Sequence, residues 1–235
     1  AEAGFTEQIL RLPHSHLCYA PETIRTMPEA GYEPPMRKNG YVTFGSFNNF
    51  AKVTDEMLLL WRGILESVRD SKLIIKGKIA SIDSGIHFVK KRLSMLSYDL
   101  ARVEFRPYSP DYLEQYRDID IVLDSAPYNG GLTTCEALYM GVPVISLRGR
   151  THGSRFGASI LTNAGVRELI AENDINYVRR AVQLAEAPKL LEAYHAGLRA
   201  NMRRSPLMNV KGYMEELETA YQEIWEHYCA INPLG

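Results

Sequence analysis

Apolar and polar positions follow two alternating patterns between residues 41 and 170. Short, continuous apolar runs are typical of parallel strands that are covered on both faces, and apolar residues recurring every three or four positions are typical of amphipathic helices. The runs predict strands at YVTFGS (41–46), KLIIKG (72–77), VEFRPY (103–108), IDIVLDS (119–125) and PVISLRG (143–149). The helical pattern covers 54–68 (capped by Thr54), 86–97, 111–117, 133–140 and 154–164, and most of the chain from 174 onward.

This order of strands and helices predicts an α/β fold with a doubly wound, Rossmann-like parallel sheet. In such sheets the ligand lies beyond the carboxyl ends of the strands. Functional residues are therefore expected just after Phe44, Ile75, Arg106, Asp124 and Leu147. Before the sheet, residues 5–12 predict a short helix or strand, and the proline-containing stretch 13–40 predicts a loop or linker.

Composition narrows the class of protein. The chain has 235 residues, 46% of them hydrophobic, which is typical of a globular protein. Its 27 basic and 28 acidic residues argue against a nucleic-acid partner, and no apolar run approaches the roughly 20 residues of a membrane span. Three cysteines without a Cys-x-x-Cys pair argue against a disulfide scaffold or a structural zinc site. We therefore expect a cytoplasmic protein that does not bind nucleic acid or membranes.

The segment DSAPYNGGLTTCE, from 124 onward, carries the richest chemistry of any predicted strand end. Gly130 and Gly131 allow close backbone approach, and Thr133 and Thr134 add hydroxyl donors where a helix begins, so the segment predicts a diphosphate site. Glu136 lies on the first helical turn, where it could accept hydrogen bonds from ribose hydroxyls. The alternative is a threonine cap with a glycine turn and a helix-stabilising acid.

Other predicted strand ends offer weaker candidates. Lys52 could supply a positive charge to phosphate, or be a solvated surface lysine. Tyr108 and Tyr112 could stack on a base, or pack half-buried against a short helix. The basic loop 148–155 could add donors or be only a basic loop.

Several known signatures are missing. No G-x-G-x-x-G follows a strand, which argues against a nicotinamide cofactor, and neither a P-loop nor a G-x-S-x-G elbow occurs. Asp118-x-Asp120 precedes a strand, so a structural role is expected there rather than a metal site.

Five segments, in order, resemble the catalytic C-terminal half of the O-GlcNAc transferase and SPINDLY family. They are GSFNNFAKVT (45–54), LIIKGK (73–78), DIDIVLDSAPYNGGLTTCEALYMGVPVISL (118–147), SRFGASILTNAGVRELIA (154–171) and SPLMNVKGYMEELETAYQEIWEHYC (205–229). The resemblance implies a GT-B architecture of two Rossmann-like domains, usually preceded by tetratricopeptide (TPR) repeats. It also implies inverting, metal-independent transfer of a sugar from a nucleotide donor to Ser or Thr of proteins.

The resemblance assigns the phosphate side of the donor site. Lys52 matches a phosphate-contacting lysine, and Asn49 a polar position beside the nucleotide. Gly131, Leu132 and Thr133 match a His-Thr-Thr that holds the diphosphate in the animal enzyme. Only the last threonine is kept, with Thr134 as a possible substitute.

The resemblance also assigns the nucleoside and sugar contacts. Glu136 matches the ribose-binding acid. Tyr108 and Ser109 match the segment whose backbone recognises uracil. Tyr112 falls where the animal enzyme has a histidine near the base, and Tyr128 where it has a cysteine near the N-acetyl group.

These departures leave the donor open. UDP-GlcNAc is expected from the majority of the family, and no cofactor or metal is expected beside the nucleotide sugar. GDP-fucose or UDP-glucose is the alternative donor, because NNxAK and YMGVP are closer to the SPINDLY branch. A non-catalytic, TPR-associated binding module is a further alternative.

The resemblance implies that the chain carries only half of a catalytic unit. Residues 1–40 are expected to be the tail of a missing N-terminal catalytic domain plus a linker, 41–229 the donor domain, and 230–235 a tail. An acceptor protein would be a partner of the whole enzyme. The apolar face of the last helix is expected to contact the missing domain, to cap its own sheet, or to form a homodimer.

Overall fold

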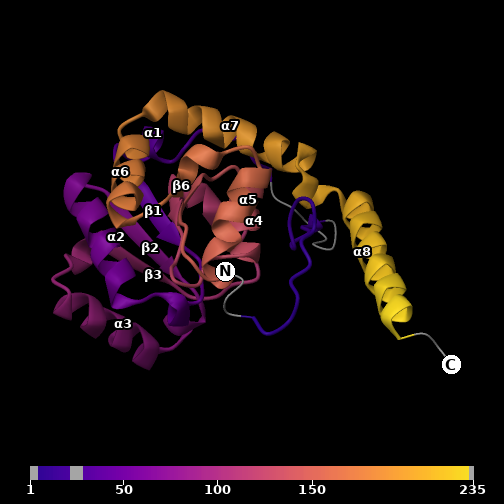
Figure 1. The fold of residues 1–235 in the computed structure, drawn as a ribbon. Helices are drawn as coiled ribbons and strands as arrows, with labels where there is room; N and C mark the ends of the chain where they lie inside the picture. Colours follow the sequence, from indigo (N-terminus) through magenta and orange to yellow (C-terminus); the bar gives the residue numbers. More distant parts are fainter. Residues whose placement is uncertain (1–4, 22–28, 233–235) are drawn as a thin grey trace.

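The computed structural model describes residues 5–21 and 29–232. Six strands form one sheet in the order β3-β2-β1-β4-β5-β6, and every neighbouring pair is parallel (Figure 1). The strands are β1 (Thr43–Ser46), β2 (Lys72–Lys76), β3 (Val103–Arg106), β4 (Ile121–Leu123), β5 (Val144–Leu147) and β6 (Ile170–Ala171). The doubly wound parallel sheet is therefore confirmed. β6 was not predicted, because two residues are too short to show a pattern.

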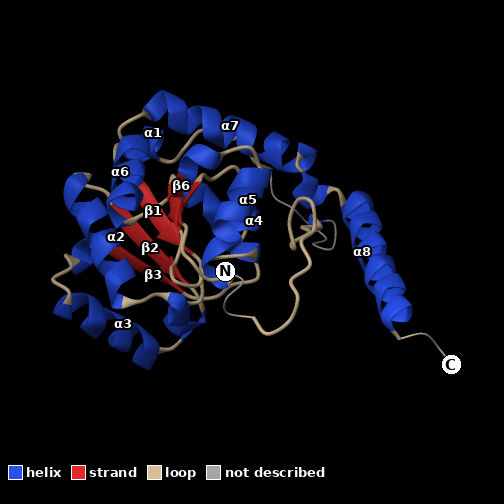
Figure 2. Cartoon of the chain, viewed as in Figure 1, coloured by secondary structure: helices blue, strands red, loops and turns tan. Residues whose placement is uncertain are grey.

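Helices cover both faces of this sheet. Figure 2 shows α2 and α6 on one side and α4 and α5 on the other. The helices are α1 (Met36–Asn39), α2 (Asp55–Ser67), α3 (Asp83–Met95), α4 (Leu132–Tyr139), α5 (Phe156–Asn163), α6 (Asp174–Ala185), α7 (Pro188–Arg204) and α8 (Val210–Ile231). The predicted cap of α2 is confirmed, because the Thr54 hydroxyl accepts a 3.3 Å hydrogen bond from the Met57 amide.

Three buried polar groups tie the helical layer on the α2 side to the end of β4. The Trp61 indole donates to the Tyr177 hydroxyl at 3.1 Å, and that hydroxyl donates to the Asp124 carbonyl at 2.8 Å. Trp61 and Tyr177 are among the largest fully buried side chains. Because their polar atoms are paired with each other and with the backbone, they fix the chain where β4 ends.

One local prediction was wrong and two hold only in part; residues 22–28 of the predicted loop 13–40 lie outside the described residues. Residues 5–12 form neither a helix nor a strand, and Phe5 and Leu10 stay exposed because no apolar surface covers them. The predicted short helix 111–117 is helical only in its second part, where a 3-10 helix covers Glu114–Asp118. Within the predicted loop 13–40, the short α1 forms because the buried Asp120 carboxylate accepts from the Met36 amide at 2.9 Å.

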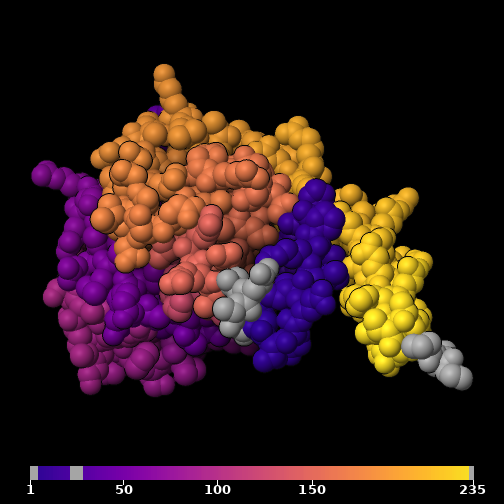
Figure 3. All heavy atoms as spheres, viewed as in Figure 1, coloured from indigo at the N-terminus to yellow at the C-terminus, as the bar shows by residue number. Residues whose placement is uncertain are grey.

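The last helix extends away from the sheet (Figure 1), and residues 5–21 lie between it and the rest of the molecule (Figure 3). Its only buried side chain among the described residues is Ala220, whereas large apolar side chains along its second half are exposed. These are Tyr221, Ile224, Trp225, Tyr228 and Ile231. The alternative that this helix caps its own sheet is therefore wrong. No helix in the described part of the chain is both long and apolar enough to cross a membrane.

Candidate functional site

The strand order reverses between β1 and β4, and in doubly wound sheets a ligand crevice is expected at this point, beyond the carboxyl ends of the strands. The first loop carries Lys52 and the second carries the glycine-rich segment before α4. A backbone bridge between Val53 and Pro127 joins the two loops. The fold therefore brings together two of the strand ends that the sequence singled out.

Lys52 lies against the second loop. Its Nζ is 4.2 Å from the centre of the Tyr128 ring and donates to the Asn129 carbonyl at 3.4 Å. Burial lowers the pKa of this ammonium, and the nearby Asp124 carboxylate opposes that effect. A half-buried cation with weak protein partners gains free energy when an anion approaches, so this position suits a phosphate group.

The beginning of α4 follows β4 at the same edge of the sheet. A Cβ on Gly130 would lie 2.6 Å from the hydroxyls of both Thr133 and Thr134, so only glycine fits there. Thr133 donates its hydroxyl hydrogen to Asn48 Oδ1 at 2.7 Å, and Thr134 donates to the Gly130 carbonyl at 3.1 Å. Helix geometry leaves the first-turn amides, beginning at Leu132, without acceptors inside the helix. These amides can receive an anion while both hydroxyl hydrogens are directed into the protein.

One turn further along α4, Glu136 forms a hydrogen-bonded pair with Tyr112, which lies just before the 3-10 helix Glu114–Asp118. The Tyr112 hydroxyl donates to Glu136 Oε1, and the Glu136 side chain is almost fully buried. Burial raises the pKa of this carboxyl, and the hydrogen bond from Tyr112 opposes the rise. The Tyr116 hydroxyl donates to the Thr133 carbonyl at 3.2 Å, so the 3-10 turn is held against α4.

Of the remaining predicted residues, Tyr108 and Ser109 lie apart from Lys52, whereas Asn49 and Gly131 lie in the two loops of the site. Tyr108 and Ser109 follow β3, which is two strands away from β1, and the exposed Tyr108 donates its amide to Ser81 Oγ at 3.0 Å. Asn49 is exposed and accepts from the Ala51 amide at 3.1 Å, so it caps the turn that carries Lys52. Gly131 caps α4.

Sequence reasoning assigned no role to three buried polar residues near these groups, namely Asn48, Lys76 and Asp124. Lys76 is 3% exposed and donates to the Pro107 carbonyl at 2.5 Å and to Ser109 Oγ at 3.0 Å. Burial lowers the pKa of this ammonium. In the sequence, Lys76 and Asp124 could have been recognised as charged residues that end otherwise apolar runs.

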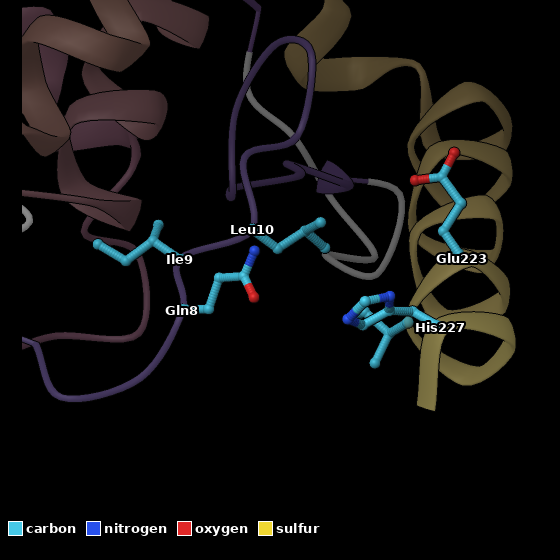
Figure 4. A pocket seen from close by; sticks show the side chains of 6 residues that line it. Gln8, Ile9, Leu10, Glu223 and His227 are labelled. Atoms are coloured by element: carbon cyan, nitrogen blue, oxygen red, sulfur yellow. The ribbon is translucent and has the colours of Figure 1, made fainter. Parts of the chain in front are cut away.

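A separate pocket of about 310 Å³ lies between residues 8–10 and α8, as Figure 4 shows. It is lined by Gln8, Ile9, Leu10, Glu223, Ile224 and His227. It shares no residue with the predicted donor site. In the described part of the chain, no three His, Cys, Asp or Glu side chains are grouped so that they could hold a metal ion.

Comparisons with known proteins support this fold and identify the family of the chain. The family model described as Glycosyl transferase family 41 matches residues 20–217. The chain is 40% identical over 228 residues to proteins described as probable UDP-N-acetylglucosamine–peptide N-acetylglucosaminyltransferase SPINDLY in Eustoma exaltatum subsp. russellianum and Arabidopsis thaliana. Each match covers 95% of this chain and 24% of the relative. The chain thus spans about a quarter of the length of these curated relatives.

A solved structure of a mutant O-GlcNAc transferase from Thermobaculum terrenum superposes with a TM-score of 0.81 at 28% identity. The match covers 97% of this chain and 43% of that one. The glycosyltransferase WaaG superposes with a TM-score of 0.59 at 18% identity, over 89% of this chain and 54% of that one, which supports the fold alone. The architecture is that of the C-terminal half of a GT-B glycosyltransferase, followed by C-terminal helices.

Proposed function

Because this chain belongs to glycosyl transferase family 41, we propose that residues 41–229 bind the nucleotide sugar of a protein O-glycosyltransferase. The observation that carries the proposal is the reversal of strand order between β1 and β4, because Lys52, the first turn of α4 and Glu136 follow the two strands that flank it. This arrangement offers a cation, backbone amides and a carboxylate to a diphosphate and its ribose.

Lys52 and the α4 amides would stabilise the negative charge that develops on the departing diphosphate. Such electrostatic stabilisation is typically worth a few kcal/mol for each donor. The lowered pKa of Lys52 rises again when a diphosphate binds beside it, because the opposite charge favours the ammonium form. The reaction we propose inverts the sugar carbon and needs no metal, with Lys52 supplying the positive charge.

We propose Glu136 as the ribose-binding group and the segment from Tyr108 as the base-recognising one. Glu136 Oε1 already accepts from Tyr112, so ribose hydroxyls would donate to the remaining carboxylate lone pairs. Tyr128, 49% exposed beside Lys52, would contact the sugar.

The donor we propose is UDP-GlcNAc, and Ser or Thr of a protein is the acceptor. The printed names of the SPINDLY relatives and of the Thermobaculum terrenum enzyme support this choice. GDP-fucose and UDP-glucose remain the alternative donors.

The acceptor side of the cleft would come from an N-terminal catalytic domain outside this sequence. The exposed apolar face of α8, together with Phe5 and Leu10, supports contact with that domain. The stacked rings of Trp225 and Tyr228 add to this surface. An interface of this kind suits large apolar side chains, which otherwise remain in contact with water.

Calorimetric titration of this chain with UDP, and separately with GDP, tests the proposal. Binding of UDP that Lys52→Ala weakens is the expected result. Preferential binding of GDP would transfer the proposal to a fucosyl donor. Binding of neither nucleotide would refute donor binding by this chain and favour a non-catalytic module.

A further inference from the structure

Asp124 is a buried carboxylate that the roles proposed above do not use. Its side chain is 0% exposed at the end of β4. Oδ1 accepts from Asn48 Nδ2 at 3.0 Å and from the amides of Ser125 at 2.8 Å and Gly130 at 2.7 Å. Oδ2 accepts from the Ser146 hydroxyl at 2.6 Å. These four hydrogen-bond donors compensate the buried negative charge, and the carboxylate in turn holds each donor in position.

This carboxylate determines which way the Asn48 amide points. A carboxylate offers only acceptors, so Asn48 turns its Nδ2 toward Asp124 and its Oδ1 toward Thr133. The Thr133 hydroxyl, 2.7 Å from that oxygen, therefore donates its hydrogen to Asn48. One chain of hydrogen bonds thus runs from α4 through the β1 loop to the end of β4.

The same carboxylate also holds the backbone at the turn before α4. Gly130 donates its amide to Asp124 Oδ1 and accepts from the Thr134 hydroxyl through its carbonyl. The surroundings are closely fitted, because a Cβ on Gly157 would lie 2.8 Å from Asp124 Oδ2 and 1.9 Å from Ser146 Oγ. The Asp124 group therefore cannot shift without moving α5 or the α4 turn.

We propose that Asp124 is a positioning residue of the donor site, which fixes the Asn48 side chain and the Gly130 backbone and so places the first turn of α4 opposite Lys52. The proposal rests on the proposed function, since it takes a nucleoside diphosphate as the ligand. The diphosphate is then bound by the α4 amides and Lys52, while the Thr133 hydroxyl serves the framework. Burial raises the pKa of the Asp124 carboxyl to about 6, which leaves it mainly ionised at pH 7.5.

The chain offers a matched control in Asp120, at the other end of the same strand. Asp120 is also 0% exposed and accepts from the amides of Met36 at 2.9 Å and Thr43 at 2.8 Å. It shares no hydrogen-bond partner with Asp124. A loss of general stability should follow from replacing either residue, whereas only Asp124 contacts the donor loops.

Binding of UDP and GDP by calorimetry at pH 7.5 compares Asp124→Ala, Asp124→Asn and Asp120→Ala with the unmodified chain. Asp124→Ala is expected to raise the nucleotide Kd at least tenfold. Asp124→Asn is expected to stay within threefold, because its Oδ1 keeps the three donors and its Nδ2 can donate to Ser146. Asp120→Ala is also expected to stay within threefold. Unchanged affinity in Asp124→Ala, or an equal loss in Asp120→Ala, would overturn the proposal.

Two further measurements keep the test decisive. Asn48→Ala cuts the hydrogen-bond chain without removing the carboxylate, so it can replace Asp124→Ala as the test if that variant does not fold. It should also raise the nucleotide Kd at least tenfold, and an unchanged Kd would count against the proposal. Hydrogen exchange at the Gly130 amide needs no nucleotide and should lose protection in Asp124→Ala but not in Asp124→Asn. Binding of no nucleotide by the unmodified chain would refute the proposed function, whereas retained Gly130 protection in Asp124→Ala would refute the positioning role.

Discussion

Replacing Lys52 with alanine is expected to weaken binding of a nucleoside diphosphate and to leave binding of the matching nucleoside almost unchanged. The Lys52 ammonium contacts the loop after β4 at the Tyr128 ring and the Asn129 carbonyl, and both contacts are weak. Lys52 can therefore turn toward a diphosphate at little cost. The nucleoside lacks the phosphate groups with which Lys52 would pair.

The expected size of the effect follows from the half-buried position of Lys52. Two opposite charges 4 Å apart attract by about 4 kcal/mol at an effective dielectric constant of 20. Loss of solvation offsets part of that attraction, so a charged hydrogen bond contributes about 1.5–3 kcal/mol. Because about 1.4 kcal/mol corresponds to a tenfold change, the Kd for UDP should rise roughly 10- to 150-fold.

Titration of the unmodified chain and of Lys52→Ala with UDP and with uridine measures this effect. Lys72→Ala is the matched control, because Lys72 also lies over a ring, 4.5 Å from the centre of Tyr41. Lys72 begins β2, so it lies at the end of the sheet opposite the crevice. Equal UDP affinity in Lys52→Ala and the unmodified chain, or an equal loss in Lys72→Ala, would refute the reasoning.

Three further predictions concern stability, base recognition and association. Burial raises the pKa of Asp120 to about 6 from its ordinary 3.8, so the folded chain holds this proton more tightly than the unfolded chain. Its contribution to the unfolding free energy should thus fall by roughly 3 kcal/mol as the pH rises from about 4 to above 6. Denaturant titrations should show a shallower fall in Asp120→Asn, and equal slopes would contradict the argument. Lys76→Met removes the contacts to Pro107 and Ser109, and competition titrations should show weaker discrimination between UDP and GDP with unchanged pyrophosphate binding. Trp225→Glu on the exposed face of α8 should reduce self-association in sedimentation without lowering the melting temperature, and a monomeric unmodified chain at all concentrations would count against this surface.

The fold was predictable where a pattern of apolar residues was long enough that only one kind of packing could cover it. The apolar run at KLIIKG has no polar face, so only a covered strand accommodates it, and the structure has β2 there. The helix after Thr54 combined a capping hydroxyl with an apolar stripe that buries Trp61, and it forms as predicted. Residues 5–12 carry the same residue types without a surface to cover them. Local pattern alone therefore did not determine their structure.

The candidate site was predictable as a set of positions and much less as a set of hydrogen bonds. Topology brings Lys52 and the α4 turn to one edge of the sheet, and that follows from the order of the strands. The hydrogen of a threonine hydroxyl, however, rotates toward whichever acceptor is nearest, and sequence does not identify that acceptor. Thr133 lies where an anion-binding hydroxyl was expected, yet its hydrogen is directed to Asn48 because Asp124 has turned the Asn48 amide. A motif that includes Thr133 but omits Asp124 therefore predicts where the proposed phosphate site lies while leaving open which atoms would donate to the phosphate.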